Sequence, residues 1–489
     1  MSKLTFIVPT FNPKPEIFTK CLKSLADQSL RDWRAIIVLD GPNEDAAKIA
    51  HKVFKKIPNH YKVVEIQHGG AQKARNAGRA YVDGHYVVHF DSDCVIEPHA
   101  AQAWVDIFDK NPDVGFIYSS YKFFDEKGAI QSEPFDPWLL KVSNYISGCF
   151  PIRTELCPTW NESLESLQDW DFWLSAVEKG AKGKYLPGYA FSTSYPTPES
   201  ISGKGCTPEN WLKRMDAVRE LHGIPKKEVC VTSLSHKMDG IALAKMIDAD
   251  YMDRPNDKPS HYKTIIQLGF SLNPGIAGLH AQAWGIEHRK VLFFSREDVD
   301  EIYNSTSLNA LDEYSKRFND AYTIFCEDKA AQRILERAGF KATILPFPMV
   351  NHDEVAPLPE KPKFLIDSSD KYQHAISVLK RALPEMDIEV SNGITPIDKA
   401  TGLIHFYVDR AMSSSIKRFL LNGRHVVSNV QQPFAGFLED KVTDENFIVS
   451  MVERLRKLAK AGPNLAGMDY YKKNLNADKL KEVLCASAL

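Results

Sequence analysis

Short apolar runs alternate with stretches of helical periodicity along the N-terminal part of the chain. The apolar runs predict buried strands at residues 5–8, 35–39, 63–66 and 86–90. Between the first two runs, Phe18, Cys21, Leu22 and Leu25 recur at the spacing of one helix face. Strands that alternate with helices in this way predict a doubly wound α/β sheet with parallel strands.

Three of these predicted strands end on residues that could contact a ligand. The first runs into Pro9 and Thr10, the second ends on Asp40, and the fourth ends on the acidic triplet 91–93. The carboxyl ends of parallel strands share one edge of the sheet, where open α/β sheets bind ligands. Carboxylates on either side of a small residue suit Mg2+ or Mn2+, because these ions prefer oxygen ligands and often share them with substrate phosphates.

The rest of the chain repeats the α/β pattern twice. Gly223-Ile224-Pro225 interrupts the chain, and a second series of strands and helices begins at residue 229. A third series begins at residue 364, after a linker stiffened by prolines at 357, 359 and 362. The predicted fold class is therefore α/β throughout, with a Rossmann-like N-terminal domain and a two-lobed module behind it. The expected domains are residues 1–222, 228–350 and 362–489.

Composition narrows the class of protein. The 489 residues are 44% hydrophobic and 25% charged, which is ordinary for a globular protein, and the net charge of −2 provides no basic field for nucleic acid or anionic membrane. No apolar run reaches the length of a membrane span, and Met1–Leu4 leads straight into a strand without a signal peptide pattern. None of the 8 cysteines forms a Cys-x-x-Cys pair, so we expect buried thiols rather than a zinc site. These features predict a cytoplasmic protein without a transmembrane segment.

Five motifs, taken in order, resemble those of family-2 glycosyltransferases, which have the GT-A fold. They are Ile7–Asn12, Leu39-Asp40-Gly41, Ala74–Gly78, Asp91-Ser92-Asp93 and Leu167–Leu174. The resemblance covers roughly the first 220 residues and implies an enzyme that transfers a sugar from a nucleotide-sugar donor to a hydroxyl acceptor. It further implies that the acceptors are precursors of cell-surface glycans and polysaccharides.

The resemblance also suggests roles for individual residues. Pro9, Thr10 and Asp40 would hold the nucleobase and ribose of the donor, and Arg75 would lie near the base or the diphosphate, with Lys73 as a neighbour. The triplet would bind Mn2+ or Mg2+ through Asp93. Asp91 and Ser92 would reach the donor ribose, or Asp91 would support the metal.

The acidic motif Gln168-Asp169-Trp170-Asp171 suggests the catalytic base. By resemblance Asp169 is the base that deprotonates the acceptor hydroxyl, and direct displacement would invert the anomeric carbon. Asp171 is the alternative, although an acid in the first turn of a helix is favoured there by the helix dipole alone. Trp170, Phe172 and Trp173 would stack on acceptor or sugar rings, with core packing as the alternative, and Trp160 would line the acceptor cleft. A histidine that family members often carry after this helix is missing from Phe191–Pro196, which would weaken the metal site.

The second and third series together resemble the two Rossmann-like lobes of GT-B glycosyltransferases. The stretch Ile416–Val427 is similar to the donor-side helix and strand of that fold, but Arg418 stands where the family has a ribose-binding Glu. The resemblance therefore implies a module that does not catalyse transfer itself.

Two other functions remain open from the sequence. The acceptor could be a hydroxylated base in DNA, as for some phage enzymes, although such binding needs a clustered basic face. The protein could also be a non-catalytic sugar-binding or scaffold protein. Intact acids at 91, 93 and 169 argue against this last function.

Overall fold

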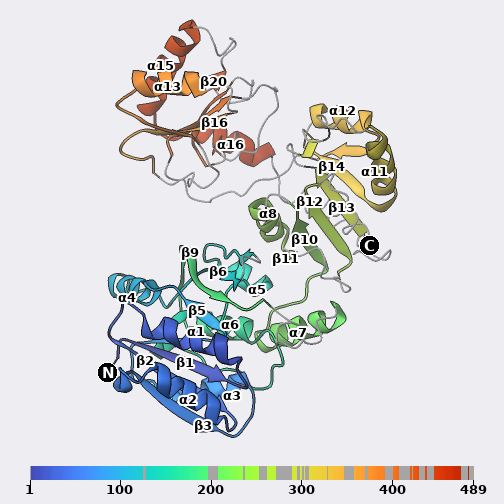
Figure 1. The fold of residues 1–489 in the computed structure, drawn as a ribbon. Coiled ribbons are helices and arrows are strands. Elements are labelled where there is room, and N and C mark those ends of the chain that lie inside the picture. The colour runs from blue at the N-terminus through green and yellow to red at the C-terminus, as the bar shows by residue number, and fades with distance from the viewer. Residues whose placement is uncertain are drawn as a thin grey trace. The chain divides into compact units, whose positions relative to one another are not determined.

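The computed structural model describes residues 2–124, 128–195, 208–234, 237–252, 262–270, 289–294, 298–299, 302, 308–327, 329–345, 357–368, 373–390, 400–406, 419–420, 422–428, 436–437, 445–474 and 483. The chain forms two compact units, Met1–Lys226 and Lys227–Leu489 (Figure 1).

The N-terminal unit is built on one nine-stranded sheet of order β3-β2-β1-β4-β8-β6-β9-β5, with β7 added beside β6. The first four strands of this order are parallel, whereas β8 runs antiparallel to β4 and β5 runs antiparallel to β9. The strands are β1 (Leu4–Thr10), β2 (Trp33–Asp40), β3 (Tyr61–Ile66), β4 (Tyr86–His89), β5 (Cys94–Ile96), β6 (Phe116–Phe123), β7 (Ala129–Ile130), β8 (Pro151–Arg153) and β9 (Gly183–Thr193).

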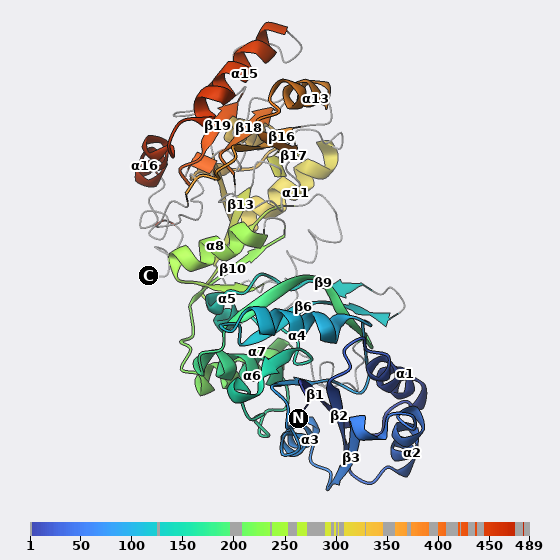
Figure 2. The same cartoon turned by 90° about the vertical axis from the view of Figure 1, so that its left-hand side faces the viewer.

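Helices cover both faces of this sheet. Figure 2 shows α1 and α2 on one face of the parallel strands and α3 on the other. The helices are α1 (Pro15–Ala26), α2 (Glu44–Val53), α3 (Ala71–Arg79), α4 (Ala100–Lys110), α5 (Pro137–Val142), α6 (Gln168–Glu178) and α7 (Pro208–Leu221), with 3-10 turns at Pro58–His60 and Thr154–Leu156. Because both faces are covered, β1 is buried along its whole length and is an almost unbroken apolar run. The predicted α/β fold of this part, with its first four strands, is confirmed.

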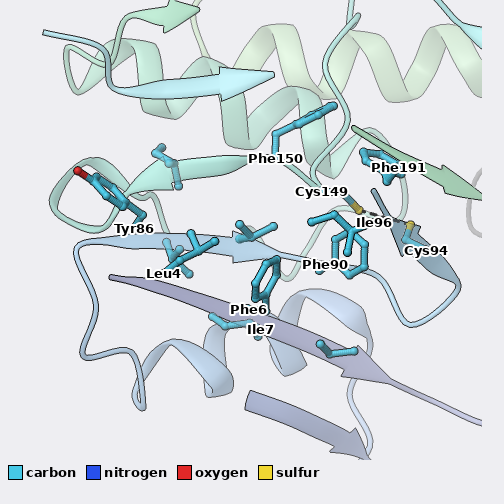
Figure 3. Close-up of a cluster of buried hydrophobic side chains, with 14 of the residues drawn as sticks. Leu4, Phe6, Ile7, Tyr86, Phe90, Cys94, Ile96, Cys149, Phe150 and Phe191 are labelled. Carbon is cyan, nitrogen blue, oxygen red and sulfur yellow. Dashed lines mark hydrogen bonds between the residues drawn. The ribbon is translucent and has the colours of Figure 1, made fainter. Parts of the chain in front are cut away.

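The core of the unit continues beneath the antiparallel strands. Figure 3 shows Phe6 and Phe90 packing toward Phe150 and Phe191, with two cysteines facing each other at the end of the cluster. Cys21, Cys94, Cys149, Cys157, Cys230 and Cys326 are all buried free thiols, as predicted for these residues.

The second unit contains two separate parallel sheets. The six-stranded sheet has the order β11-β10-β12-β13-β14-β15, and the five-stranded sheet has the order β17-β16-β18-β19-β20. The strands are β10 (Val229–Ser233), β11 (Asp250–Met252), β12 (Thr264–Leu268), β13 (Arg289–Phe294), β14 (Thr323–Cys326), β15 (Ala342–Ile344), β16 (Lys363–Ser368), β17 (Asp387–Val390), β18 (Gly402–Phe406), β19 (His425–Ser428) and β20 (Gly436–Phe437). The helices are α8 (Lys237–Ile247), α11 (Leu308–Ala321), α12 (Lys329–Arg337), α13 (Gln373–Ala382), α15 (Glu445–Ala459) and α16 (Leu465–Asn474).

The resemblance of this unit to the GT-B fold stays a prediction. Parallel strands joined through helices are the architecture expected of two Rossmann-like lobes. Arg418, on which the prediction of a non-catalytic module rests, lies outside the described residues.

Candidate active site

The parallel strands β1, β2 and β4 end side by side at one edge of the sheet. Thr10 pairs with Leu39 in the β1–β2 register, and the Phe90 amide donates to the Ile7 carbonyl just before the acidic triplet. Pro9 and Thr10 are buried, and the Thr10 hydroxyl donates to the Val8 carbonyl at 3.1 Å. The structure therefore brings this strand end to the site but leaves both side chains inside the sheet.

Asp40 holds the loop between β3 and α3. Its carboxylate accepts from the backbone amides of Gly69 at 2.8 Å and Gly70 at 2.9 Å, and lies 2.9 Å from His68 Nδ1. The imidazole of His68 in turn stacks on the exposed ring of Phe11, with 4.2 Å between ring centroids. Asp40 thus supports an exposed aromatic pair, which the sequence interpretation did not identify.

Arg75 is the buried cation of the site. It is 7% exposed, and its Nη2 donates to Asp91 Oδ1 at 2.6 Å. The flat guanidinium lies over the Trp160 ring, 4.3 Å from its centroid. Burial lowers the pKa of Arg75, but the charges of Asp91 and Asp169 more than offset this, and the net effect is a raised pKa. The guanidinium therefore stays protonated between two acids.

The residues next to Arg75 in the motif have structural roles. The Asn76 side chain accepts from the Trp160 amide and donates to the Trp160 carbonyl, both at 2.9 Å. A Cβ on Gly78 would lie 2.5 Å from Ile7 Cγ2 and 3.0 Å from Val38 Cγ2. Gly78 therefore allows α3 to lie directly on β1 and β2, while Asn76 fixes the segment that stacks on Arg75.

Lys73 is the residue directly before this motif, and its aliphatic stem packs against Gly69. The structure therefore places Lys73 over the loop that Asp40 holds.

The acidic triplet forms the turn between β4 and β5. The Asp91 side chain is 39% exposed, Ser92 is partly exposed, and Asp93 makes a hydrogen bond with Ser194. Burial and the neighbouring Asp91 raise the pKa of Asp93 to about 6, against the lowering effect of Ser194. Two carboxylates that repel each other in a half-buried turn fit a divalent cation, which would relieve that repulsion. Among the described residues, no group of three or more His, Cys, Asp or Glu side chains is placed to hold a metal ion, so other ligands would come from water and phosphate oxygens.

Three thiols lie beneath this turn. Cys21 Sγ is 3.6 Å from the Asp91 carbonyl oxygen, and Cys94 Sγ is 3.9 Å from Cys149 Sγ (Figure 3). Burial raises the pKa of the Cys21 thiol well above its ordinary value. These thiols are therefore neutral packing groups under the acids.

Asp169 lies across from the triplet, in the first turn of α6. Its Oδ2 accepts from the Gly148 amide at 3.2 Å. Burial raises the pKa of Asp169, the nearby Arg75 lowers it, Asp91 raises it, and the net pKa is above the ordinary value. The residue before the helix, Leu167, has a left-handed φ of 60°, which turns the chain sharply into α6. The structure therefore places Asp169 within electrostatic reach of Arg75 and Asp91.

Asp171 has a different environment. It is buried and lies 3.1 Å from His222 Nε2, while His222 Nδ1 lies 2.7 Å from Glu178. Burial lowers the pKa of His222, but the two acids raise it overall. Asp171 thus joins α6 to the end of α7, which is a structural role.

The aromatic residues around Asp169 belong to the core. Trp160, Trp170, Phe172 and Trp173 are almost fully buried, and Trp160 stacks on Phe172 with 4.4 Å between ring centroids. Of the two predicted roles, stacking on sugar rings and core packing, they have the second. Trp160 contributes to the site only through Arg75.

Comparison with known proteins bears on the identity of this unit. Residues 5–157 match the family model described as glycosyl transferase family 2. The N-terminal unit therefore contains a family-2 glycosyltransferase domain. The matched segment includes the strand ends, Arg75 and the acidic triplet, and it ends before Asp169.

Several proteins resemble part of this chain. An uncharacterized glycosyltransferase of Methanocaldococcus jannaschii is 23% identical over 210 residues, which cover 40% of this chain and 72% of that protein. A chondroitin synthase of Escherichia coli is 23% identical, over 36% of this chain and 27% of that protein. A teichoic acid poly(glycerol phosphate) polymerase of Staphylococcus epidermidis is 27% identical, over 55% of this chain and 39% of that protein. The match thus spans less than half of the two characterised relatives.

Solved structures also resemble the chain, with low TM-scores. Staphylococcus aureus TarS 1–349 in complex with UDP-GlcNAc is 18% identical with a TM-score of 0.41, over 66% of this chain and 84% of that chain. A mannosyltransferase of Pyrobaculum calidifontis in complex with GDP-Man and Mn2+ is 16% identical with a TM-score of 0.34, over 40% of this chain and 58% of that chain.

Within the described residues, no helix combines the length and the apolar composition that crossing a bilayer would require.

Proposed function

We propose that this protein is a metal-dependent, inverting glycosyltransferase that moves a sugar from a nucleotide-sugar donor to a hydroxyl of a polysaccharide or a related cell-surface polymer. One observation carries the proposal. In a family-2 domain, Arg75 is held between Asp91 of the acidic triplet and Asp169 of α6, at the carboxyl edge of the parallel strands. A buried cation beside two acids at this edge suits a bound diphosphate and a group that accepts a proton.

The donor would lie along the strand ends. The stacked pair Phe11 and His68 offers an exposed flat surface for a nucleobase, and Asp40 holds that surface in place through the loop it binds. The Arg75 guanidinium matches phosphate oxygens, and burial strengthens that interaction. The nucleoside would therefore lie over β1 and β2, with its diphosphate near the triplet.

A divalent cation would be held by Asp93 and Asp91. When bound, such a cation supplies Lewis-acid stabilisation to the departing diphosphate. A complete set of protein ligands is not needed, because phosphate oxygens and water complete the coordination shell of Mg2+ in such sites.

Asp169 would act as the general base. Its raised pKa makes it a better proton acceptor than an ordinary carboxylate, and the nearby Arg75 opposes the raising effect of burial on that pKa. It would take the proton of the acceptor hydroxyl while that oxygen attacks the anomeric carbon from the side opposite the diphosphate. Direct displacement with one base inverts that carbon.

The acceptor class rests on the relatives. Two of them are named as a chondroitin synthase and a teichoic acid poly(glycerol phosphate) polymerase, and from these names we infer an acceptor that is a growing polymer. Nothing in the described residues favours DNA or a non-catalytic role over this acceptor class.

The test compares two acids on the same helix. Purified protein is incubated with a panel of UDP- and GDP-sugars and Mn2+, and release of the nucleoside diphosphate is measured with and without EDTA. General-base participation is worth about 10²–10⁴-fold in rate, so Asp169→Asn should lose turnover by that factor while still binding the donor. Asp171→Asn is the matched control and should keep turnover, because its partner is His222.

Two outcomes would contradict the proposal. If Asp169→Asn turns over as fast as wild type, Asp169 is not the base. If EDTA leaves the rate unchanged, the metal-dependent part is wrong.

A further inference from the structure

A partly exposed pair of aromatic rings lies beside the acidic triplet. Phe123 at the end of β6 and Tyr195 just after β9 contact each other edge to face, with 5.0 Å between ring centroids. Tyr195 is 53% exposed. Large aromatic side chains on a surface are often binding groups, because one ring face can cover an apolar ligand surface while the Tyr hydroxyl remains wet.

The pair is rigidly supported from the core. Phe123 contacts Tyr121 edge to face at 6.1 Å, and Tyr121 stacks on the buried ring of Phe191 at 5.0 Å. Phe123 is paired with Thr193 in the β6–β9 register. The two rings therefore end a continuous series of ring contacts that reaches the core.

The backbone connects this surface to the triplet. Ser194, which precedes Tyr195, makes the hydrogen bond with Asp93. β9 also pairs with β5, the strand that follows the triplet, with Cys94 opposite Thr193. The rings thus flank the group that would hold the diphosphate.

The surface lies on the acceptor side of the site. In the sheet order β3-β2-β1-β4-β8-β6-β9-β5, the strands β1 and β2 that would carry the nucleoside lie on one side of β4, whereas β6 and β9 lie on the other (Figure 1). The acceptor hydroxyl attacks the donor sugar on the side opposite the leaving diphosphate. The acceptor must therefore approach from outside the strands that would carry the nucleoside. The Phe123–Tyr195 pair lies on the side of β4 away from these two strands.

We propose that Phe123 and Tyr195 form an acceptor subsite that binds a pyranose ring of the acceptor through the Tyr195 ring. The axial C–H face of a pyranose is apolar and complements the negative face of an aromatic ring. This inference rests on the proposed function, because an acceptor subsite requires a transferase.

The test separates transfer from hydrolysis of the donor. Wild type and variants are given the nucleotide sugar that the panel identifies, with Mn2+, and with either a p-nitrophenyl β-pyranoside or glycerol as acceptor. A single aromatic stacking contact supplies about tenfold in affinity, so Tyr195→Ala should raise KM for the pyranoside by about that factor and lower the ratio of transfer to hydrolysis. Tyr195→Phe should keep the KM for the pyranoside and the ratio of transfer to hydrolysis of wild type. The ratio for glycerol, which has no ring, should not change.

Tyr189→Ala is the matched control. Tyr189 also lies on β9 and is 37% exposed, but its ring contacts Lys122 and its hydroxyl accepts from Gln131. It should leave KM for the pyranoside as in wild type. Urea unfolding of each variant checks that the fold is intact.

The outcomes distinguish this inference from the proposed function. Turnover with an unchanged KM for the pyranoside in Tyr195→Ala overturns the subsite alone. A rise in the KM for the donor, without a change for the pyranoside, assigns the rings to the donor and also overturns it. Absence of any turnover by wild type overturns the proposed function and this inference with it.

Discussion

Gly78→Ala tests the close approach of α3 to the sheet. The new Cβ would lie 2.5 Å from Ile7 Cγ2 and 3.0 Å from Val38 Cγ2, and both neighbours are fully buried in central strands. Carbon atoms without a bond between them are normally about 3.5–4.0 Å apart. Since β-branched side chains in a packed sheet have little freedom to rotate, α3 itself must move.

The magnitude follows from two opposing contributions. Adding a methyl group to a well-packed core typically costs about 1–3 kcal/mol. Alanine in place of glycine gains at most about 1 kcal/mol of helix propensity. With both contacts inside the van der Waals distance the cost lies at the upper end, so we expect a net loss of about 2 kcal/mol of stability.

Urea unfolding followed by tryptophan fluorescence measures this loss. All but one of the 8 tryptophans lie in the N-terminal unit, so the fluorescence signal reports on the unfolding of that unit. They are Trp33, Trp104, Trp138, Trp160, Trp170, Trp173 and Trp211. At a slope of about 2 kcal/mol per M, the midpoint should fall by about 1 M. Donor affinity should fall as well, because α3 carries Arg75.

An unchanged or higher midpoint for Gly78→Ala would refute the reasoning, since it would mean that propensity outweighs the contact. Gly462→Ala, at a glycine with open space around it, is the control for the substitution itself and should leave unfolding by circular dichroism unchanged.

Two further predictions concern contacts near the base. The contact of His222 with Asp171 and Glu178 stabilises the fold fully below the ordinary histidine pKa of 6.5, and this stabilisation is lost as the pH rises through the raised pKa of His222. Between about pH 6 and pH 8.5, wild type should therefore lose more stability than His222→Gln in urea titrations. An equal loss in both proteins would show that the contact does not titrate. Asn76→Ala leaves the Trp160 amide and carbonyl without their partner and should cost about 1–3 kcal/mol by the same assay, whereas a cost near zero would show that the segment around Trp160 holds itself.

Local pattern was enough to predict the parallel half of the sheet. Strands buried on both faces are continuous apolar runs, so β1, β2 and β4 were visible in the sequence together with the polar residues at their ends. The family resemblance added Asp169 as the expected catalytic base. The structure places Asp169 within electrostatic reach of Asp91 and Arg75, and its role as the base stays a prediction.

The remaining contacts join residues far apart in the chain and have no local pattern. The contact between Asp171 and His222 spans 51 residues, and that between Asn76 and Trp160 spans 84. The sequence identifies Trp160 and Phe172 only as aromatic residues, and aromatic residues occur both on ligand-binding surfaces and in cores. The ring pair of Phe123 and Tyr195 was missed because it forms only when β6 and β9 lie side by side.

Asp40 has a consequence for the order in which the unit can fold. Its carboxylate meets the amides of Gly69 and Gly70 only after β2 and β3 have paired, with Asp40 opposite Ile66. The entropy of closing that loop must be offset before the contact forms. The start of α3, and Arg75 with it, is therefore tied to the pairing of β2 with β3, and a chain in which these two strands are unpaired would lack the contact that positions the arginine beside the acidic triplet.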